Sequence, residues 1–391
     1  MHEALIVSGS RTPIGAFGGG LARVPAPELA ARCVESVLQR SQVGVDLVDE
    51  VILGNVIGAG IGQNPARQAT LKAGLPVSVG ATTVNKVCGS GLKAVMLAAQ
   101  SIQLGHARIV VAGGMENMSL APYLLPQART GYRLGNGSLV DSLMFDGLWD
   151  CYGEQPMGTY GDRCAEAFGF SREQQDDFAV RSYTRALTAI SRQVFDAEIT
   201  PIDVVDRKRT TTVSADEEPL RFDEDKLRAL RPAFAKDGTV TAGNASSIND
   251  GAAALLLVAE GRAPDLSVPP IARIVGAATF SREPEWFTTA PIGAIRKLLD
   301  AVQWSVETTD LFEINEAFAT VTMAAEKELE LPAEKVNIFG GAVSLGHPIG
   351  CSGARILVTL LNGLKQTGGR RGIACLCIGG GEAVALAVEM V

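Results

Sequence analysis

Short apolar runs alternate with amphipathic stretches along the first part of the chain. The runs rich in valine and isoleucine have the length and side-chain type of buried strands, and they lie at residues 4–7, at 50–53, near Ala81 and at 109–112. Between these runs, residues 27–40 and 65–73 carry apolar side chains at helical spacing. The alternation predicts an α/β fold in which helices cover a sheet.

The pattern changes twice further along the chain. From about Asn117 prolines and glycines interrupt it, and a long polar helix is predicted at residues 171–195. The pattern rich in alanine, valine and glycine returns at Gly243 and continues to the end. We therefore predict three parts. They are a first half of the core at residues 1–117, to which about 243–268 return, an inserted loop domain at 118–242, and a second half at 269–391.

Part of the first half recurs near the C-terminus. In residues 84–114 and again in 336–381, a Val-Asn pair is followed by Ser-Gly, an apolar helix, a buried strand and a group of glycines. The two Ser-Gly pairs begin at Ser90 and Ser352. This repetition predicts two copies of one βαβ unit that face each other across a pseudo-twofold axis. A site between the copies would take residues from both.

Cys88 is the first candidate for chemistry. It lies in the sequence Val-Cys-Gly-Ser-Gly at residues 87–91, after a strand and before an apolar helix that ends near Gly105. At a helix N-terminus the free N–H groups and the helix dipole favour a thiolate, so we expect a lowered pKa. The glycines leave room for an acyl group. A buried core cysteine is the commoner role, and this motif alone does not decide between them.

His347 lies in a glycine-rich loop, residues 340–350, directly before another apolar helix. The chain has three histidines, of which His2 is terminal and His106 follows a predicted helix end. His347 is therefore the candidate for a base or an oxyanion donor. A purely structural histidine is the alternative.

A second cysteine lies at the end of a predicted strand. Cys375 and Cys377 share one face of it, and only Cys377 adjoins the three glycines that begin at Gly379. A redox pair or half of a metal site would be the competing interpretation. The sequence offers no further cysteine pair or nearby histidine as ligands, so no metal is expected.

Two polar segments complete the candidates. Asn315 precedes a predicted helix, where it would act as a cap or hold a water molecule or a ligand oxygen. Residues 243–251 form a polar loop of small residues before a predicted alanine-rich helix. This loop fits a channel for a slender ligand.

Composition limits the partners. The chain has 391 residues and a net charge of −8, which argues against a nucleic-acid partner. No apolar run reaches the roughly 18 to 20 residues of a membrane-spanning helix. The first residues enter a strand pattern without a signal or transit peptide, so a cytoplasmic protein is expected. The number of cysteines is seven, which is odd, and their spacing predicts no disulfide framework.

These motifs together resemble the thiolase family, from residues 10–15 (Ser-Arg-Thr-Pro-Ile-Gly) to the final strand. The resemblance implies the thiolase fold, a duplicated α-β-α-β-α core of five layers with an inserted loop domain. Residues 123–150 are similar to the loop that ties dimers into tetramers, so a homotetramer is expected. The implied activity is acetyl-CoA C-acetyltransferase, which joins two acetyl-CoA into acetoacetyl-CoA and free coenzyme A. The coenzyme A thioester is then a substrate, and no cofactor is implied.

The resemblance also implies the role of each candidate. Cys88 takes up the acyl group, His347 raises its nucleophilicity, and Cys377 is the acid and base of the condensation step. One oxyanion site is formed by the N–H groups of Cys88 and Gly379, and the other by His347 with a water held by Asn315. The implied contacts to coenzyme A and the acyl group are Ser246, Arg221, Met157, Phe234, Ala317 and Phe318.

Several positions depart from the family pattern. Pro156, Ser247 and Glu382 stand where histidine, glycine and methionine are usual, and this proline also occurs in longer-chain 3-ketoacyl-CoA thiolases. A degradative 3-ketoacyl-CoA thiolase of broader chain length is therefore an alternative. A non-catalytic protein that binds acyl-CoA or lipid is another. A decarboxylating ketoacyl synthase is disfavoured because such enzymes use two histidines with the cysteine.

Overall fold

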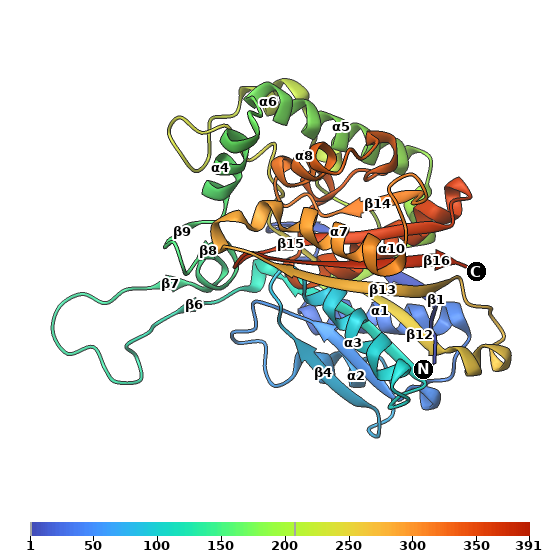
Figure 1. The fold of residues 1–391 in the computed structure, drawn as a ribbon. Coiled ribbons are helices and arrows are strands. Elements are labelled where there is room, and N and C mark those ends of the chain that lie inside the picture. The colour runs from blue at the N-terminus through green and yellow to red at the C-terminus, as the bar shows by residue number, and fades with distance from the viewer. Residues whose placement is uncertain (1, 207–208) are drawn as a thin grey trace.

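The computed structural model describes residues 2–206 and 209–391, and its core consists of five layers (Figure 1). The strands are ordered β14-β15-β16-β13-β1-β12-β5-β3-β4, with β2 beside β12. Strands β1 and β13 pair at only two positions, so the sheet divides there into two stacked halves. The bounds are β1 Ala4–Arg11, β2 Gly15–Ala16, β3 Glu50–Gly54, β4 Gly80–Val84, β5 Ile109–Asn117, β12 Asn249–Ala259, β13 Ala272–Ser281, β14 Leu311–Ile314, β15 Arg371–Ile378 and β16 Glu382–Met390.

Helices occupy the other three layers. Helices α3 and α10 lie between the two halves of the sheet, in a core shared by both. Helices α1 and α2 cover the outer face of the first half, and α7 and α8 cover that of the second. In the described part of the chain, no helix is both long and apolar enough to cross a membrane. The bounds are α1 Ala26–Ser41, α2 Pro65–Lys72, α3 Ser90–Gln103, α7 Ala290–Val302, α8 Ala319–Glu328, α9 Ala342–Leu345 and α10 Ile349–Thr367.

The two halves repeat one another. In the first half the elements follow the order β1-α1-β3-α2-β4-α3-β5-β12. In the second half β13-α7-β14-α8 corresponds to β1-α1-β3-α2, and α10-β15-β16 corresponds to α3-β5-β12. In the second half a single parallel bridge between Phe312 and Val336 stands where β3 and β4 pair in the first. This pattern is the duplication that the sequence predicts.

One predicted element is wrong. The alanine-rich helix expected after the loop at residues 243–251 is strand β12, which pairs antiparallel with β1 on one side and β5 on the other. All of its residues are buried. A strand covered on both faces has a continuous apolar sequence, so its pattern does not distinguish it from a buried helix.

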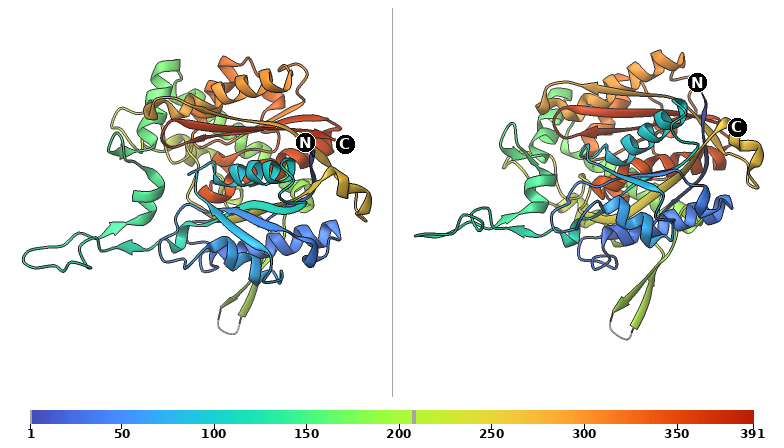
Figure 2. Two further views of the ribbon diagram at one scale, coloured as in Figure 1. Left: turned by 60° about the horizontal axis from the view of Figure 1, so that its bottom comes forward. Right: turned by 90° about the horizontal axis from the view of Figure 1, so that it is seen from below.

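The segment at residues 118–242 runs between β5 and β12. A long arm, carried by the pair β6 Tyr123–Leu124 and β7 Val140–Asp141, extends far from the core (Figure 1). The predicted long helix is α5 Arg172–Ser191, which begins with a capping box formed by Ser171 and Gln174. A second hairpin, formed by strands β10 and β11, projects from the core at another place (Figure 2). The remaining elements are a π-helix Leu143–Leu148, β8 Trp149–Asp150, β9 Gln155–Pro156, α4 Gly158–Phe168, β10 Ile202–Asp206, β11 Arg209–Val213 and α6 Glu224–Ala229.

Candidate active site

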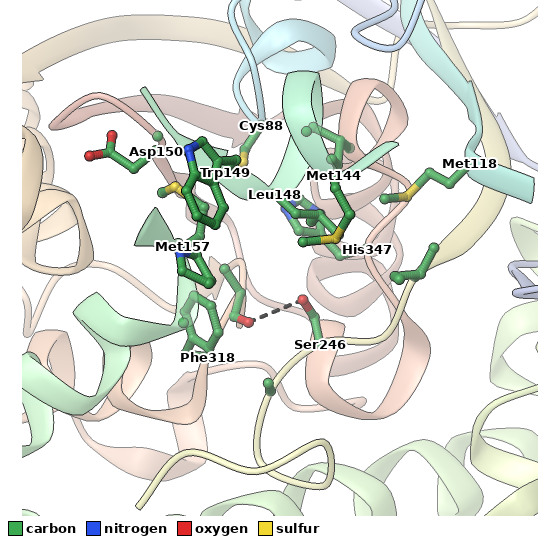
Figure 3. Close-up of a pocket in the computed structure, with 18 of the residues that line it drawn as sticks. Cys88, Met118, Met144, Leu148, Trp149, Asp150, Met157, Ser246, Phe318 and His347 are labelled. Atoms are coloured by element: carbon green, nitrogen blue, oxygen red, sulfur yellow. Dashed lines mark hydrogen bonds between the residues drawn. The ribbon is translucent and has the colours of Figure 1, made fainter. Parts of the chain in front are cut away.

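A largely apolar cavity of about 670 Å³ opens between the two halves and the inserted segment (Figure 3). Nine of the eleven predicted site residues line it. Asn315 and Cys377 do not, because both are fully buried. The nine are Cys88, Met157, Arg221, Phe234, Ser246, Ala317, Phe318, His347 and Gly379.

Cys88 lies on a tight turn between β4 and α3. The preceding residue, Val87, has a φ of 46°, which is unfavourable for a β-branched side chain. The side chain of Ser90 fixes this turn, since its Oγ donates to the carbonyl of Val87 at 2.6 Å and accepts from the N–H of Lys86 at 2.8 Å. The turn thus places the half-buried Cys88 at the cavity.

The electrostatics of Cys88 differ from the prediction. Burial raises the pKa of its thiol to about 11, although the backbone N–H groups of Gly379 and of Cys88 itself favour the thiolate. The lowered pKa expected from the helix N-terminus is therefore wrong, because the loss of solvent outweighs these donors. At neutral pH Cys88 is therefore a thiol, and its predicted role as a nucleophile requires a base.

His347 is held in an orientation that suits this task. Its backbone N–H donates to Asn249 Oδ1 at 2.9 Å, and its Nδ1 lies 2.6 Å from Ser352 Oγ. The Ser352 hydroxyl donates to the carbonyl of Pro348 at 2.9 Å, so it accepts the proton of Nδ1. The lone pair is then on Nε2. Burial lowers the pKa of His347 to about 3, which keeps the ring neutral at pH 7 with the lone pair of Nε2 free.

Asn315 lies beside the same nitrogen. Its Nδ2 is 3.5 Å from Nε2 of His347, and its backbone N–H donates to the carbonyl of Cys375 at 2.9 Å. Its buried Oδ1 has no hydrogen-bond partner among the described residues. An amide held by its backbone with one oxygen unpaired suits the predicted role of holding a water molecule.

Cys377 lies behind the cavity wall, near the end of β15. It packs in an apolar cluster with Met157, Ala317 and Phe318, which themselves line the cavity. Burial raises the pKa of Cys377 well above its ordinary value, and the nearby sulfur of Cys88 raises it further. Its thiol therefore keeps its proton unless a partner in the cavity takes it.

Cys375, the other cysteine of β15, is part of the hydrophobic core. Cys375 packs under α7, and its sulfur lies 3.9 Å from the carbonyl of Pro291. All seven cysteines lie in the described residues and are free. Among the described residues, no three side chains of His, Cys, Asp or Glu are grouped to hold a metal ion.

The predicted substrate contacts form a path from the surface to Cys88. Arg221 lies at the outer part with its side chain 55% exposed, 3.7 Å from Glu218. Phe234 packs edge-on against Phe318 at a centroid distance of 6.1 Å. The N–H and the hydroxyl of Ser246 both donate to the carbonyl of Ala317 at 3.0 Å, which joins the polar loop to the segment before α8 (Figure 3).

Comparison with known proteins decides the family. The family described as "Thiolase, N-terminal domain" matches residues 4–261, and "Thiolase, C-terminal domain" matches residues 268–390. The chain belongs to the thiolase family. An acetyl-CoA acetyltransferase of Pseudomonas aeruginosa is 50% identical to this thiolase over 396 residues, which cover 99% of each chain.

Solved thiolase structures share the whole architecture. An acetyl-CoA acetyltransferase of Bacillus anthracis is 46% identical with a TM-score of 0.98, covering 100% of this chain and 99% of that one. A thiolase of Ascaris suum in complex with coenzyme A is 42% identical with a TM-score of 0.95, covering 100% of both. The predicted fold is thus confirmed.

Two carboxylates of this thiolase support the site and were not predicted. Glu116, at the end of β5, accepts from the N–H groups of Val56, Ile57 and Gly350, and burial raises its pKa to about 7. Glu316 accepts from the N–H of Val343 in the loop that carries the histidine. Glu316 adjoins Asn315 in sequence, but only the folded chain shows which N–H groups each carboxylate meets.

Proposed function

We propose that this thiolase is an acetyl-CoA acetyltransferase that joins two acetyl-CoA into acetoacetyl-CoA and coenzyme A, reversibly. One observation carries the proposal. The thiol of Cys88 and a neutral imidazole line one largely apolar cavity, a second thiol lies buried behind its wall, and the N–H of Gly379 favours the Cys88 thiolate. The names of the relatives support the choice of acetyl groups.

In the first half-reaction, Nε2 of His347 takes the proton of Cys88 and the sulfur attacks the thioester carbonyl. The N–H groups of Cys88 and Gly379 stabilise the oxyanion. The carbon–sulfur bond to coenzyme A then breaks, and the departing thiolate takes a proton from Cys377. The products are an acyl-enzyme, free coenzyme A, a Cys377 thiolate and an imidazolium.

In the second half-reaction, the Cys377 thiolate removes a proton from the methyl group of a second acetyl-CoA. The protonated Nε2 of His347, with a water held by Asn315, stabilises the enolate oxygen. The enolate carbon attacks the acyl-enzyme and displaces the sulfur of Cys88, which recovers its proton from His347. The raised pKa of Cys377 serves this step, because a strong base is needed to ionise a thioester methyl.

A broader chain length is the second candidate. Pro156 lines the cavity together with Leu148, Trp149, Tyr152 and Phe287, so largely apolar walls would hold a longer acyl chain. The polypeptide would then serve as a degradative 3-ketoacyl-CoA thiolase with the same residues in the same roles.

A thiolysis assay tests the proposal. We expect rapid cleavage of acetoacetyl-CoA, slow cleavage of a long-chain 3-ketoacyl-CoA, and a loss on the order of 10⁴-fold or more in Cys88→Ser. Cys377→Ala should exchange labelled coenzyme A with acetyl-CoA more slowly, because the departing thiolate loses its proton donor, and it should form no acetoacetyl-CoA. A preference for the long substrate would overturn the acetyl assignment.

A second measurement separates an enzyme from a binding protein. Iodoacetamide should label Cys88, and prior incubation with acetyl-CoA should block this labelling because the sulfur carries the acetyl group. No cleavage of either substrate, together with labelling that acetyl-CoA leaves unchanged, would show a protein that does not turn over.

A further inference from the structure

An ion pair crosses the boundary between the two copies beside the nucleophile. Lys86 Nζ lies 2.6 Å from Glu382 Oε2, with side chains that are 21% and 32% exposed. Lys86 is two residues before Cys88, and Glu382 is three residues after Gly379. The pair therefore joins the turn that carries the sulfur to the turn that supplies an N–H to it.

The turn at Gly379 joins β15 to β16 and is closed by the pairing of Ile378 with Glu382. Gly380 and Gly381 have φ values of 92° and 90°, and neither has a side chain to pack. The carbonyl of Gly381 accepts from the N–H of Arg282 at 2.8 Å, which fixes only its far end. The position of the Gly379 N–H thus depends on how Ile378 and Glu382, at the two ends of the turn, are held.

Glu382 is well placed to hold the turn. It pairs with Ile378 across the turn and with Ser281 in β13, whose hydroxyl donates to Oε1 at 3.2 Å. Its other oxygen is the one that meets Lys86. On the opposite side, the backbone N–H of Lys86 is bound to Ser90 at the start of α3. The ion pair thus connects two anchored backbones.

We propose that the ion pair between Lys86 and Glu382 positions the N–H of Gly379 against the sulfur of Cys88. Neither side chain lines the cavity, so both are positioning residues that touch no reacting atom. Glu382 is also one of the positions that depart from the family pattern, where methionine is usual. The inference rests on the proposed function, since that N–H serves as an oxyanion donor there.

Two other roles for the pair make different predictions. A partly exposed ion pair without a function would change activity little when broken. A direct effect of the Lys86 charge on Cys88 would shift the thiol pKa up in Lys86→Met and down in Glu382→Gln. The positioning role raises the pKa in both variants, because both loosen the N–H that favours the thiolate.

The test compares Lys86→Met, Glu382→Gln and the double variant. We expect each single variant to lower kcat for thiolysis of acetoacetyl-CoA about tenfold with KM nearly unchanged, since a misplaced donor weakens the transition state. The double variant should lose no more than either single one. Mass spectrometry of the Cys88 peptide after iodoacetamide treatment across a pH series should show a raised apparent pKa in all three.

A matched control is available. The pair between Arg181 and Glu326 has an N–O distance of 2.5 Å and similar exposure, and it joins α5 to α8 away from the turns at Cys88 and Gly379. Glu326→Gln should leave both readouts unchanged. Additive losses in the double variant, opposite pKa shifts, or unchanged kcat would each overturn the inference. Alkylation needs no turnover, so it tests the positioning even if the proposed function fails.

Discussion

Gly91 of α3 and Gly353 of α10 lie where the two central helices cross, each against the backbone of the other helix. A β-carbon on Gly353 would lie 2.3 Å from the backbone nitrogen of Leu92, and one on Gly91 would lie 2.7 Å from that of Ala354. The two glycines occupy equivalent positions in the repeat. The close approach of the helices therefore depends on both.

Gly353→Ala should destabilise the protein by about 2 to 3 kcal/mol, because backbone atoms cannot move aside as a flexible side chain would. Denaturant unfolding at a fixed protein concentration measures this loss. Gly261→Ala is the control, since a β-carbon there meets nothing within 4 Å. Equal stability of the two variants would contradict the packing described here.

Alkylation of Cys88 should keep accelerating beyond about pH 9. Iodoacetamide reacts with the thiolate, and burial raises the pKa of this thiol to about 11, so the thiolate fraction still grows with each step in pH. His347, with a pKa of about 3, supplies no imidazolium to stabilise a thiolate at neutral pH. A rate that levels off near neutral pH would instead indicate a preformed ion pair.

Ser352→Ala should lower kcat about ten- to a hundredfold and leave KM nearly unchanged. Without the hydroxyl at Nδ1, the ring of His347 is free to place its proton on Nε2, where it is useless as a base. Ser344→Ala is the matched control, since its buried hydroxyl bonds to Ser182 and the carbonyl of Gly341. Both variants should lose about 1 kcal/mol of stability. Equal activities would show that tautomer control is unimportant.

Shortening the arm should change the oligomeric state. Leu125, Leu134 and Leu139 are 54%, 101% and 62% exposed in one protomer, a density of apolar surface that suits contact with another copy. Replacing residues 127–137 by a short Gly-Ser link should convert the expected tetramer into dimers, seen as half the mass by light scattering. An unchanged mass would place the tetramer contacts elsewhere.

The local chemistry was readable from sequence because it depends on local motifs. Cys88, followed by Gly89 and Gly91, and His347, in its glycine-rich loop, are recognisable because each is also followed by an apolar helix. The layered fold followed from the alternation of strands and helices and from the repeat.

The missed features depend on contacts between distant segments. The pKa of Cys88 is governed by how completely other segments bury it, and the four N–H and amide donors of Glu116 come from residues up to 234 positions away. Strand β12 was predicted as a helix because its burial on both faces removes the alternation that marks a strand.

The burial of Cys377 has a consequence for isotopes. The thiol has no exposed surface, so in the proposed mechanism a hydrogen taken from a substrate methyl group leaves it only by return to carbon or by transfer to a departing coenzyme A. Tritium on that methyl group should then reach water only as coenzyme A is released, and not by direct exchange of the Cys377 thiol with solvent. The buried thiol of Cys377 would thus hold one substrate-derived hydrogen out of exchange with solvent.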